Sequence, residues 1–107
     1  MRWQAEDGNL TIVQMKLGDM LLELFCYAEP KQAPESTQQL ESDLKRIGIK
    51  HFGLKTENIE STRQQLIKLG QCDESTAITH GRTGIDYLFL KDPDGIFVEI
   101  VQDNRAL

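Results

Sequence analysis

Two strand-like apolar runs open the chain and predict a β-hairpin over residues 10–27. The runs extend from Leu10 to Leu17 and from Met20 to Tyr27. Gly18-Asp19 between them suits a two-residue type II′ turn, whose first position needs the positive φ that glycine adopts easily. Residues 1–9 are polar apart from Trp3, so we expect a loop there, or at most a short piece of strand.

A helix is predicted from Ile59 to Leu69, after a strand over residues 47–56. Asn58 suits the N-cap, where its side chain accepts a hydrogen bond from the first turn, and Gly70 suits the position just past the helix end. Apolar or small residues recur at helical spacing and define the face expected to pack on a sheet: Ile59, Thr62, Leu66 and Leu69.

Three strands are predicted after the helix, over residues 71–79, 85–91 and 96–102. Asp92-Pro93-Asp94-Gly95 joins the last two and suits a type I turn, with Asp first, Pro second and Gly fourth. The final strand is apolar on both faces, yet Glu99 lies in its middle. A carboxylate in such a strand is costly to bury without a partner, a hydrogen bond or a metal.

An internal repeat connects the two halves of the sequence. Residues 18–25 align with residues 94–101, because each segment is a Gly/Asp turn followed by an apolar strand with one glutamate in its middle. Glu23 and Glu99 occupy the matching positions. The fold class is therefore α+β, with one full βαβββ module preceded by the last part of another.

The segment between the halves reads as a linker. Residues 28–39 show no periodicity and contain Pro30 and Pro34, and only a weak helical pattern follows at residues 38–46. A length of 107 residues favours one domain. We expect a single domain over residues 1–107, divided into a partial first module (1–30), a linker (31–46) and a complete second module (47–107).

Composition and charge narrow the function classes. The chain is 39% hydrophobic and 27% charged with a net charge of -5, as in ordinary globular proteins. The acidity argues against a nucleic-acid partner and against docking on anionic lipid. No apolar run approaches the length of a membrane span and no signal peptide opens the sequence, so we expect a cytoplasmic protein.

Cys26 and Cys72 are too few for a zinc knuckle or a disulfide framework, and Cys26 is expected in the core.

Three side chains with metal-ligand chemistry lie mid-strand among apolar neighbours: Glu23, His51 and Glu99. If their faces line one concave sheet, two carboxylates and an imidazole converge in an apolar pocket. Such ligands suit Mn, Fe, Co, Ni or Zn, and the lack of thiolates disfavours a structural zinc site. Taken singly, each also fits an ordinary role, as a hydrogen-bonded core histidine or a glutamate that faces solvent.

His80 and Arg82 are weaker candidates. They lie in a glycine-flanked segment that suits a loop or a strand edge, where a side chain can contribute a ligand or an anion contact. A solvated loop is the simpler interpretation. No glycine-rich phosphate loop, serine elbow or Cys/His nucleophile pair is present.

These residues together resemble the vicinal oxygen chelate superfamily, also called the glyoxalase/bleomycin resistance/dioxygenase superfamily. The resemblance rests on residues 49–54, on residues 58–60 opening the helix, on residues 89–99, and on residues 21–25. It implies two βαβββ modules paired into a cupped mixed sheet around a divalent transition metal, with ligands from the first and last strands of each module. By that pattern His51 and Glu99 are the ligands of the second module, and Glu23 is a ligand of the first.

The first strand and helix of the first module, and the ligand they would bring, are missing from this pattern. We therefore expect an N-terminally shortened member, a member whose cup is completed by a second subunit, or one that has lost its metal and only binds a ligand. A missing strand leaves an unpaired sheet edge, which proteins usually cover. A homodimer that covers this edge is expected.

The resemblance implies a metal-dependent lyase or isomerase similar to lactoylglutathione lyase, acting on a small carbonyl or thioester substrate. The metal would polarise a substrate oxygen, and Glu23 or Glu99 would take a proton from the adjacent carbon. A dioxygenase matches less well, because its facial triad needs two histidines and one carboxylate. The alternative from another class is a metal-free protein that binds or sequesters a small molecule such as a drug, for which aromatics such as Trp3 are suited. A degenerate fragment that assembles with another chain is a third alternative.

Overall fold

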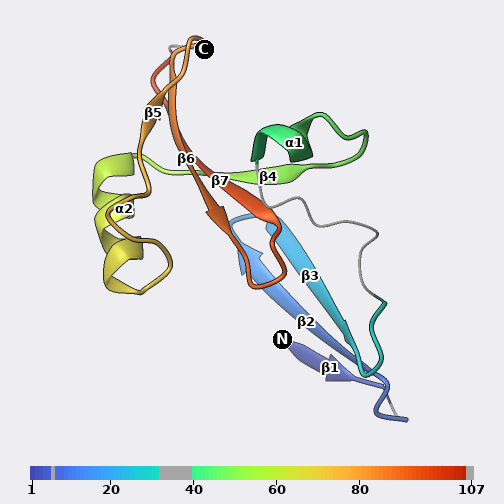
Figure 1. Cartoon of the computed structure of the whole chain (residues 1–107). Coiled ribbons are helices and arrows are strands. Elements are labelled where there is room, and N and C mark those ends of the chain that lie inside the picture. The colour runs from blue at the N-terminus through green and yellow to red at the C-terminus, as the bar shows by residue number, and fades with distance from the viewer. Residues whose placement is uncertain (6, 32–39, 106–107) are drawn as a thin grey trace. The chain divides into compact units, whose positions relative to one another are not determined.

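The structure is a computed structural model of the 107-residue chain, and it describes residues 1–5, 7–31 and 40–105, without the side chains of residues 42 and 43. The chain forms two compact units, Met1–Glu35 (unit 1) and Ser36–Leu107 (unit 2). In Figure 1 the described strands of unit 1 run from blue to cyan and the described elements of unit 2 from green to red. Much of the expected linker, residues 32–39, lies outside the described residues.

Unit 1 is an antiparallel sheet in the order β1-β2-β3. Its strands are β1 (Arg2–Gln4), β2 (Leu10–Leu17) and β3 (Met20–Tyr27). The bounds of β2 and β3 agree with the hairpin expected from the sequence. Gly18 has a φ of +59°, and among the described residues no non-glycine residue, Asp19 included, has a positive φ. A type II′ turn requires this combination at its two central positions.

The strand β1 forms within a polar segment because pairing with β2 stabilises it. Trp3 lies opposite Ile12, which in turn lies opposite Phe25 on β3. The main chain of β1 therefore finds hydrogen-bond partners along the outer edge of β2, and the indole packs over a strand that is already apolar. The sequence of residues 2–4 gives little sign of a strand, because the main-chain pairing and the packing of the indole both depend on β2.

Side-chain alternation gives the sheet of unit 1 two faces, and both carry apolar groups. We call one the pocket face; it carries Met1, Trp3, Ile12, Gln14, Glu23 and Phe25. We call the other the aliphatic face; it carries Val13, Met15, Leu17, Met20, Leu22, Leu24 and Cys26. Cys26 is exposed. The expectation that Cys26 lies in the core is wrong, because no described element of unit 1 covers the aliphatic face.

Unit 2 contains a mixed sheet in the order β4-β7-β6-β5. Strands β4 and β7 are parallel, whereas β7 pairs antiparallel with β6 and β6 with β5. The elements are α1 (Leu40–Leu44), β4 (His51–Lys55), α2 (Ile59–Lys68), β5 (Thr79–His80), β6 (Ile85–Lys91) and β7 (Phe97–Asp103). The expected βαβββ order is therefore present from β4 to β7, and the chain has an α+β fold.

Helix α2 covers one face of the sheet in unit 2 (Figure 1). Ile59 packs with Leu88 and Ile100 in a buried cluster, with Leu66 at its border. As expected, the Asn58 side chain caps the helix by accepting a hydrogen bond from Ser61 N. The prediction that Leu69 belongs to the apolar face of the helix is wrong. Leu69 is the C-cap, and it is 71% exposed.

Two predicted strands of unit 2 are shorter in the structure. The strand expected over residues 71–79 is reduced to β5, because the Arg63 guanidinium donates hydrogen bonds to the Thr76 and Glu74 carbonyl oxygens and holds this connection as a loop. The strand expected over residues 47–56 begins only at His51. No helix among the described residues is long and apolar enough to cross a membrane.

Candidate functional site

His51 and Glu99 lie next to each other on neighbouring parallel strands of unit 2. His51 opens β4, and Glu99 lies in the middle of β7, where its backbone neighbour on β4 is Gly53. Both side chains point away from the face that α2 covers, by strand alternation. The Nε2 atom of His51 is 3.7 Å from Oε2 of Glu99. The tertiary structure thus brings together two of the three expected ligands.

A cluster of aromatic rings begins beside His51. The His51 ring makes an edge-to-face contact with Phe89, with centroids 5.1 Å apart, and Phe89 makes similar contacts with Tyr87 and Phe97. The side chains of His51 and Glu99 are only 26% and 20% exposed. The carboxylate and the imidazole therefore lie in a mostly apolar setting, where electrostatic interactions are stronger than in bulk water.

The space beside the Glu99 carboxylate is kept open by Gly53. A Cβ atom added at Gly53 would lie 3.6 Å from Oε1 of Glu99 and 3.8 Å from the side chain of Val101. These are ordinary contact distances, so alanine would fit, but a branched side chain would meet the carboxylate. The glycine thus leaves one oxygen of Glu99 accessible from the β4 side.

The pair fits two ligands of one metal ion. A separation of 3.7 Å is too long for a hydrogen bond. It matches two donor atoms that each lie about 2.1 Å from a common ion, which are then roughly 3 to 4 Å apart. Nδ1 of His51 is buried without a hydrogen-bond partner, but its lone pair or proton points away from Nε2, so it cannot bind the same ion. Its missing partner therefore adds no support for this metal site.

A third ligand is not found beside this pair in unit 2. Among the described residues, no group of three or more His, Cys, Asp and Glu side chains is arranged to hold a metal ion. Catalytic metal sites commonly use three protein ligands and one open position. The metal, and the assignment of Glu23, His51 and Glu99 as its ligands, therefore stay predictions.

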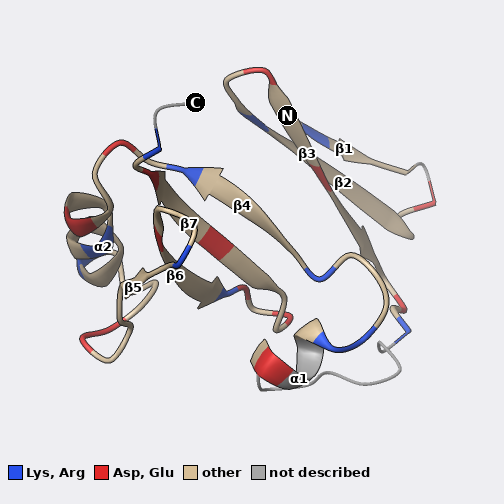
Figure 2. Cartoon of the chain, turned by 90° about the horizontal axis from the view of Figure 1, so that it is seen from above, with Lys and Arg blue, Asp and Glu red and all other residues tan. Residues whose placement is uncertain are grey.

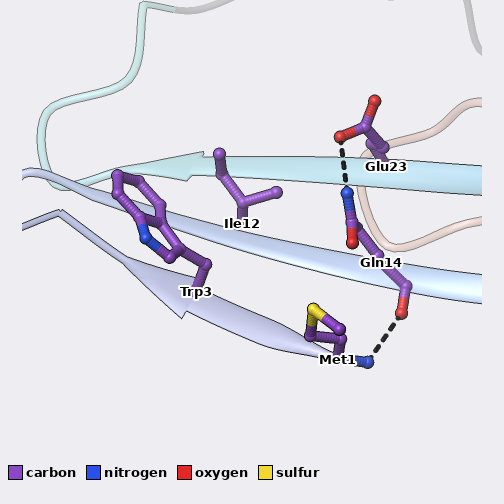
Figure 3. Close-up of a pocket in the computed structure, with 5 residues that line it drawn as sticks. All are labelled: Met1, Trp3, Ile12, Gln14 and Glu23. Atoms are coloured by element: carbon purple, nitrogen blue, oxygen red, sulfur yellow. Dashed lines mark hydrogen bonds between the residues drawn. The ribbon is translucent and has the colours of Figure 1, made fainter.

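Glu23 lies on the pocket face of unit 1. Its Oε2 accepts a hydrogen bond of 3.0 Å from Nε2 of Gln14, the residue opposite it on β2. These two residues line a pocket of about 210 Å³ together with Met1, Trp3 and Ile12 (Figure 3). The Met1 ammonium group donates to the Gln14 carbonyl oxygen at 3.0 Å. Sequence reasoning missed Gln14, because its role depends on the β2–β3 register.

Each glutamate of the sequence repeat lies on the second strand of an antiparallel hairpin. Glu23 lies opposite Gln14 on the preceding strand, and Glu99 lies opposite Phe89 on the preceding strand. The two glutamates differ in their other neighbour. β7 has the parallel strand β4 beside it, which brings His51, whereas within the described part of unit 1 β3 pairs only with β2.

His80 is engaged elsewhere in unit 2. Its Nδ1 lies 2.6 Å from Oδ1 of Asp86, the residue opposite it on β6. Asn104 donates to the other oxygen of Asp86 at 2.9 Å. The hydrogen bonds from His80 and then Asn104 hold the pKa of Asp86 below its ordinary value. The His80 side chain is 79% exposed, and Arg82 lies exposed just beyond β5.

Most of the chain matches a model of a known protein family. The family model described as Glyoxalase/Bleomycin resistance protein/Dioxygenase superfamily matches residues 2–100. No curated protein matches the sequence.

Two solved structures share the fold over most of the chain. The crystal structure of SMU.1112c is 25% identical with a TM-score of 0.73, and the match covers 94% of this chain and 76% of that chain. The glyoxalase family protein from Enterococcus faecalis is 26% identical with a TM-score of 0.70, and the match covers 94% and 74% of the two chains. The extent of the family match shows that this chain belongs to the Glyoxalase/Bleomycin resistance protein/Dioxygenase superfamily.

Proposed function

We propose that this protein is a metal-dependent lyase or isomerase that acts on a small carbonyl or thioester compound. The observation that carries the proposal is the approach of Nε2 of His51 to Oε2 of Glu99 at 3.7 Å. Membership of the superfamily supports this class of chemistry without selecting one reaction, because one fold hosts several activities.

His51 and Glu99 would hold the metal, and Glu23 is the third ligand implied by the family pattern. A divalent transition metal bound there would polarise a substrate oxygen. A carboxylate, Glu23 or Glu99, would take the proton from the carbon next to the substrate carbonyl. Phe89 and its neighbouring rings would exclude water from this reaction, so that the carboxylate acts in an apolar setting.

The decisive experiment measures the metal content of the purified protein. We expect about one transition metal ion per one or two chains in the wild type, and loss of this metal in Glu99→Gln, because the amide is a much poorer ligand than the carboxylate. Glu60→Gln is the matched control, since Glu60 is an exposed glutamate in the first turn of α2. Absence of metal after incubation with Ni, Co, Mn and Zn would contradict the proposal.

Activity gives a second test. A screen of carbonyl and thioester substrates should find a turnover that is lost with a chelator and with His51→Ala. Restoring the metal should rescue the wild type but not the variant. Turnover that persists both in the presence of a chelator and in His51→Ala would show that other residues carry out the reaction.

A metal-free binding protein is the second candidate, and the pocket on unit 1 favours it. Trp3 offers an indole that is 52% exposed, and Glu23 offers a carboxylate in the same pocket. An aromatic face and a carboxylate suit a flat or cationic organic ligand. Trp3 is the single tryptophan of the chain, so ligand binding in the pocket should change the intrinsic fluorescence. In this case binding would be unaffected by a chelator and weakened by Glu23→Gln.

A further inference from the structure

The imidazole of His51 is not held in place by a hydrogen bond at its inner nitrogen. Nδ1 is buried without a partner, and Nε2 lies 3.7 Å from Oε2 of Glu99, which is beyond hydrogen-bonding distance. The neighbouring strand β7 carries charged residues only at Glu99 and Asp103, and its other residues are tan in Figure 2. Histidines that bind metals commonly take their orientation from a hydrogen bond at the second ring nitrogen. His51 must be oriented in another way.

Phe89 makes a directional contact with the His51 ring. The two rings lie edge to face, with their centroids 5.1 Å apart and their planes at 85°. This arrangement is attractive because the edge of an aromatic ring is positive and its face is negative, so the contact depends on ring orientation. The terminal torsion of a histidine side chain has only a broad preference of its own. A neighbouring ring can therefore select the plane of the imidazole.

The position of Phe89 in the sheet connects it with both members of the pair. Phe89 lies opposite Glu99 in the antiparallel pairing of β6 with β7. Side chains of opposite residues share one face of a sheet, with Cβ atoms about 5 Å apart. The Phe89 ring is itself held by edge-to-face contacts with Tyr87 and Phe97, at 5.7 and 6.2 Å between centroids. Phe97 is only 7% exposed, so the ring that contacts His51 is anchored in the buried part of unit 2.

We propose that Phe89 is a positioning residue that fixes the plane of the His51 imidazole, so that Nε2 faces the carboxylate of Glu99. The aromatic ring takes the place of the hydrogen-bonded partner that Nδ1 lacks. Phe89→Leu keeps an apolar group beside His51 but removes the ring, whereas Phe89→Tyr keeps the ring. The orientation of the imidazole does not depend on the proposed function, whereas its consequence for metal affinity rests on it.

NMR spectroscopy of the full chain, freed of metal by a chelator, tests the orientation. The chain has two histidines, and His51→Ala assigns their signals. In the wild type, the aromatic ring of Phe89 should displace the imidazole proton resonances of His51. Phe89→Leu should remove this displacement and Phe89→Tyr should retain it. The resonances of His80, which is 79% exposed and bonded to Asp86, should be the same in every variant.

Tyr87→Leu is the matched control. It removes a ring from the same face of the same strand, and the contact of that ring is with Phe89. The His51 resonances should change much less in Tyr87→Leu than in Phe89→Leu. Unchanged His51 resonances in Phe89→Leu overturn the proposal. Equal changes in both variants also overturn it, because they indicate a general loss of packing.

Metal affinity gives the second measurement. Titration calorimetry with Zn should show binding that is about ten- to a hundredfold weaker in Phe89→Leu, as for other changes beside a metal ligand. Phe89→Tyr and Tyr87→Leu should bind Zn nearly as tightly as the wild type. If the wild type binds Zn and Phe89→Leu binds it equally well, the proposal is overturned. A wild type that binds no metal contradicts the proposed function instead, and the NMR comparison alone then decides the role of Phe89.

Discussion

Nε2 of His51 lies 3.7 Å from Oε2 of Glu99, although the backbone partner of His51 on β7 is Phe97. The two side chains therefore meet diagonally across parallel strands. Gly53, the true backbone partner of Glu99, has no side chain to fill the space in front of the carboxylate. The arrangement gives a direct way to test whether carboxylate position controls metal binding.

Gly53→Val should weaken metal binding without removing either ligand. A Cβ atom at this position already lies 3.6 Å from Oε1 of Glu99, so the added methyl groups would displace the carboxylate from His51. We expect a loss of about ten- to a hundredfold in metal affinity, as for other changes beside a metal ligand. Titration calorimetry with Ni or Zn measures it. Gly53→Ala is the control, and equal affinity in all three proteins would contradict the proposed site.

Leu88→Ala should destabilise unit 2 strongly. Leu88 is 1% exposed and forms a buried cluster with Ile59 and Ile100, so the truncation leaves a cavity that α2 and the sheet cannot easily close. The expected loss is about 3 kcal/mol in the free energy of unfolding, measured by urea denaturation. Leu69→Ala, at a position that is 71% exposed, should cost less than about 0.5 kcal/mol. A similar loss of unfolding free energy in both variants would show that Leu88 is not a core residue.

Asn58→Ala should remove the N-cap of α2. The Asn58 side chain accepts a hydrogen bond of 3.0 Å from Ser61 N, and this amide has no partner within the helix. The expected cost is about 1 kcal/mol in the free energy of unfolding. Asn58→Asp keeps an acceptor at the same place and should retain most of the stability. An alanine variant as stable as the wild type would show that the cap contributes nothing.

Stability at acid pH should depend on the pair Asp103–Arg105. Two hydrogen bonds from the Arg105 side chain and one from its backbone lower the pKa of Asp103 from 3.8 to about 2. Because the folded pKa lies below the unfolded value, the stabilisation is fully present above pH 3.8 and is lost as the pH falls through about 2.

Urea denaturation at a series of pH values measures this effect. Arg105→Ala should reduce the fall in stability between about pH 4 and pH 2, and Arg82→Ala, which removes the same charge elsewhere, should leave that fall unchanged. Identical pH profiles for wild type and Arg105→Ala would contradict the assignment.

The sequence alone determined several of the local elements and the family. The bounds of β2, β3 and β6 follow from apolar runs with turn residues at their ends, and α2 begins where Asn58 provides a cap. The turn at Asp92–Gly95 was also predictable, and the structure confirms it with a 3.0 Å hydrogen bond from Gly95 N to the Asp92 carbonyl oxygen. These features depend on residues that are close in the sequence, so pattern and propensity are sufficient to find them.

Tertiary structure decided which side chains meet and which remain exposed. The 3.7 Å approach of His51 to Glu99, the hydrogen bond from Gln14 to Glu23, and the pairing of His80 with Asp86 all depend on strand register, which no single segment specifies. Burial also depends on what lies opposite. Two strands with similar apolar sequences differ because α2 packs on one sheet and no described element of unit 1 packs on the other, and an apolar run does not carry that information.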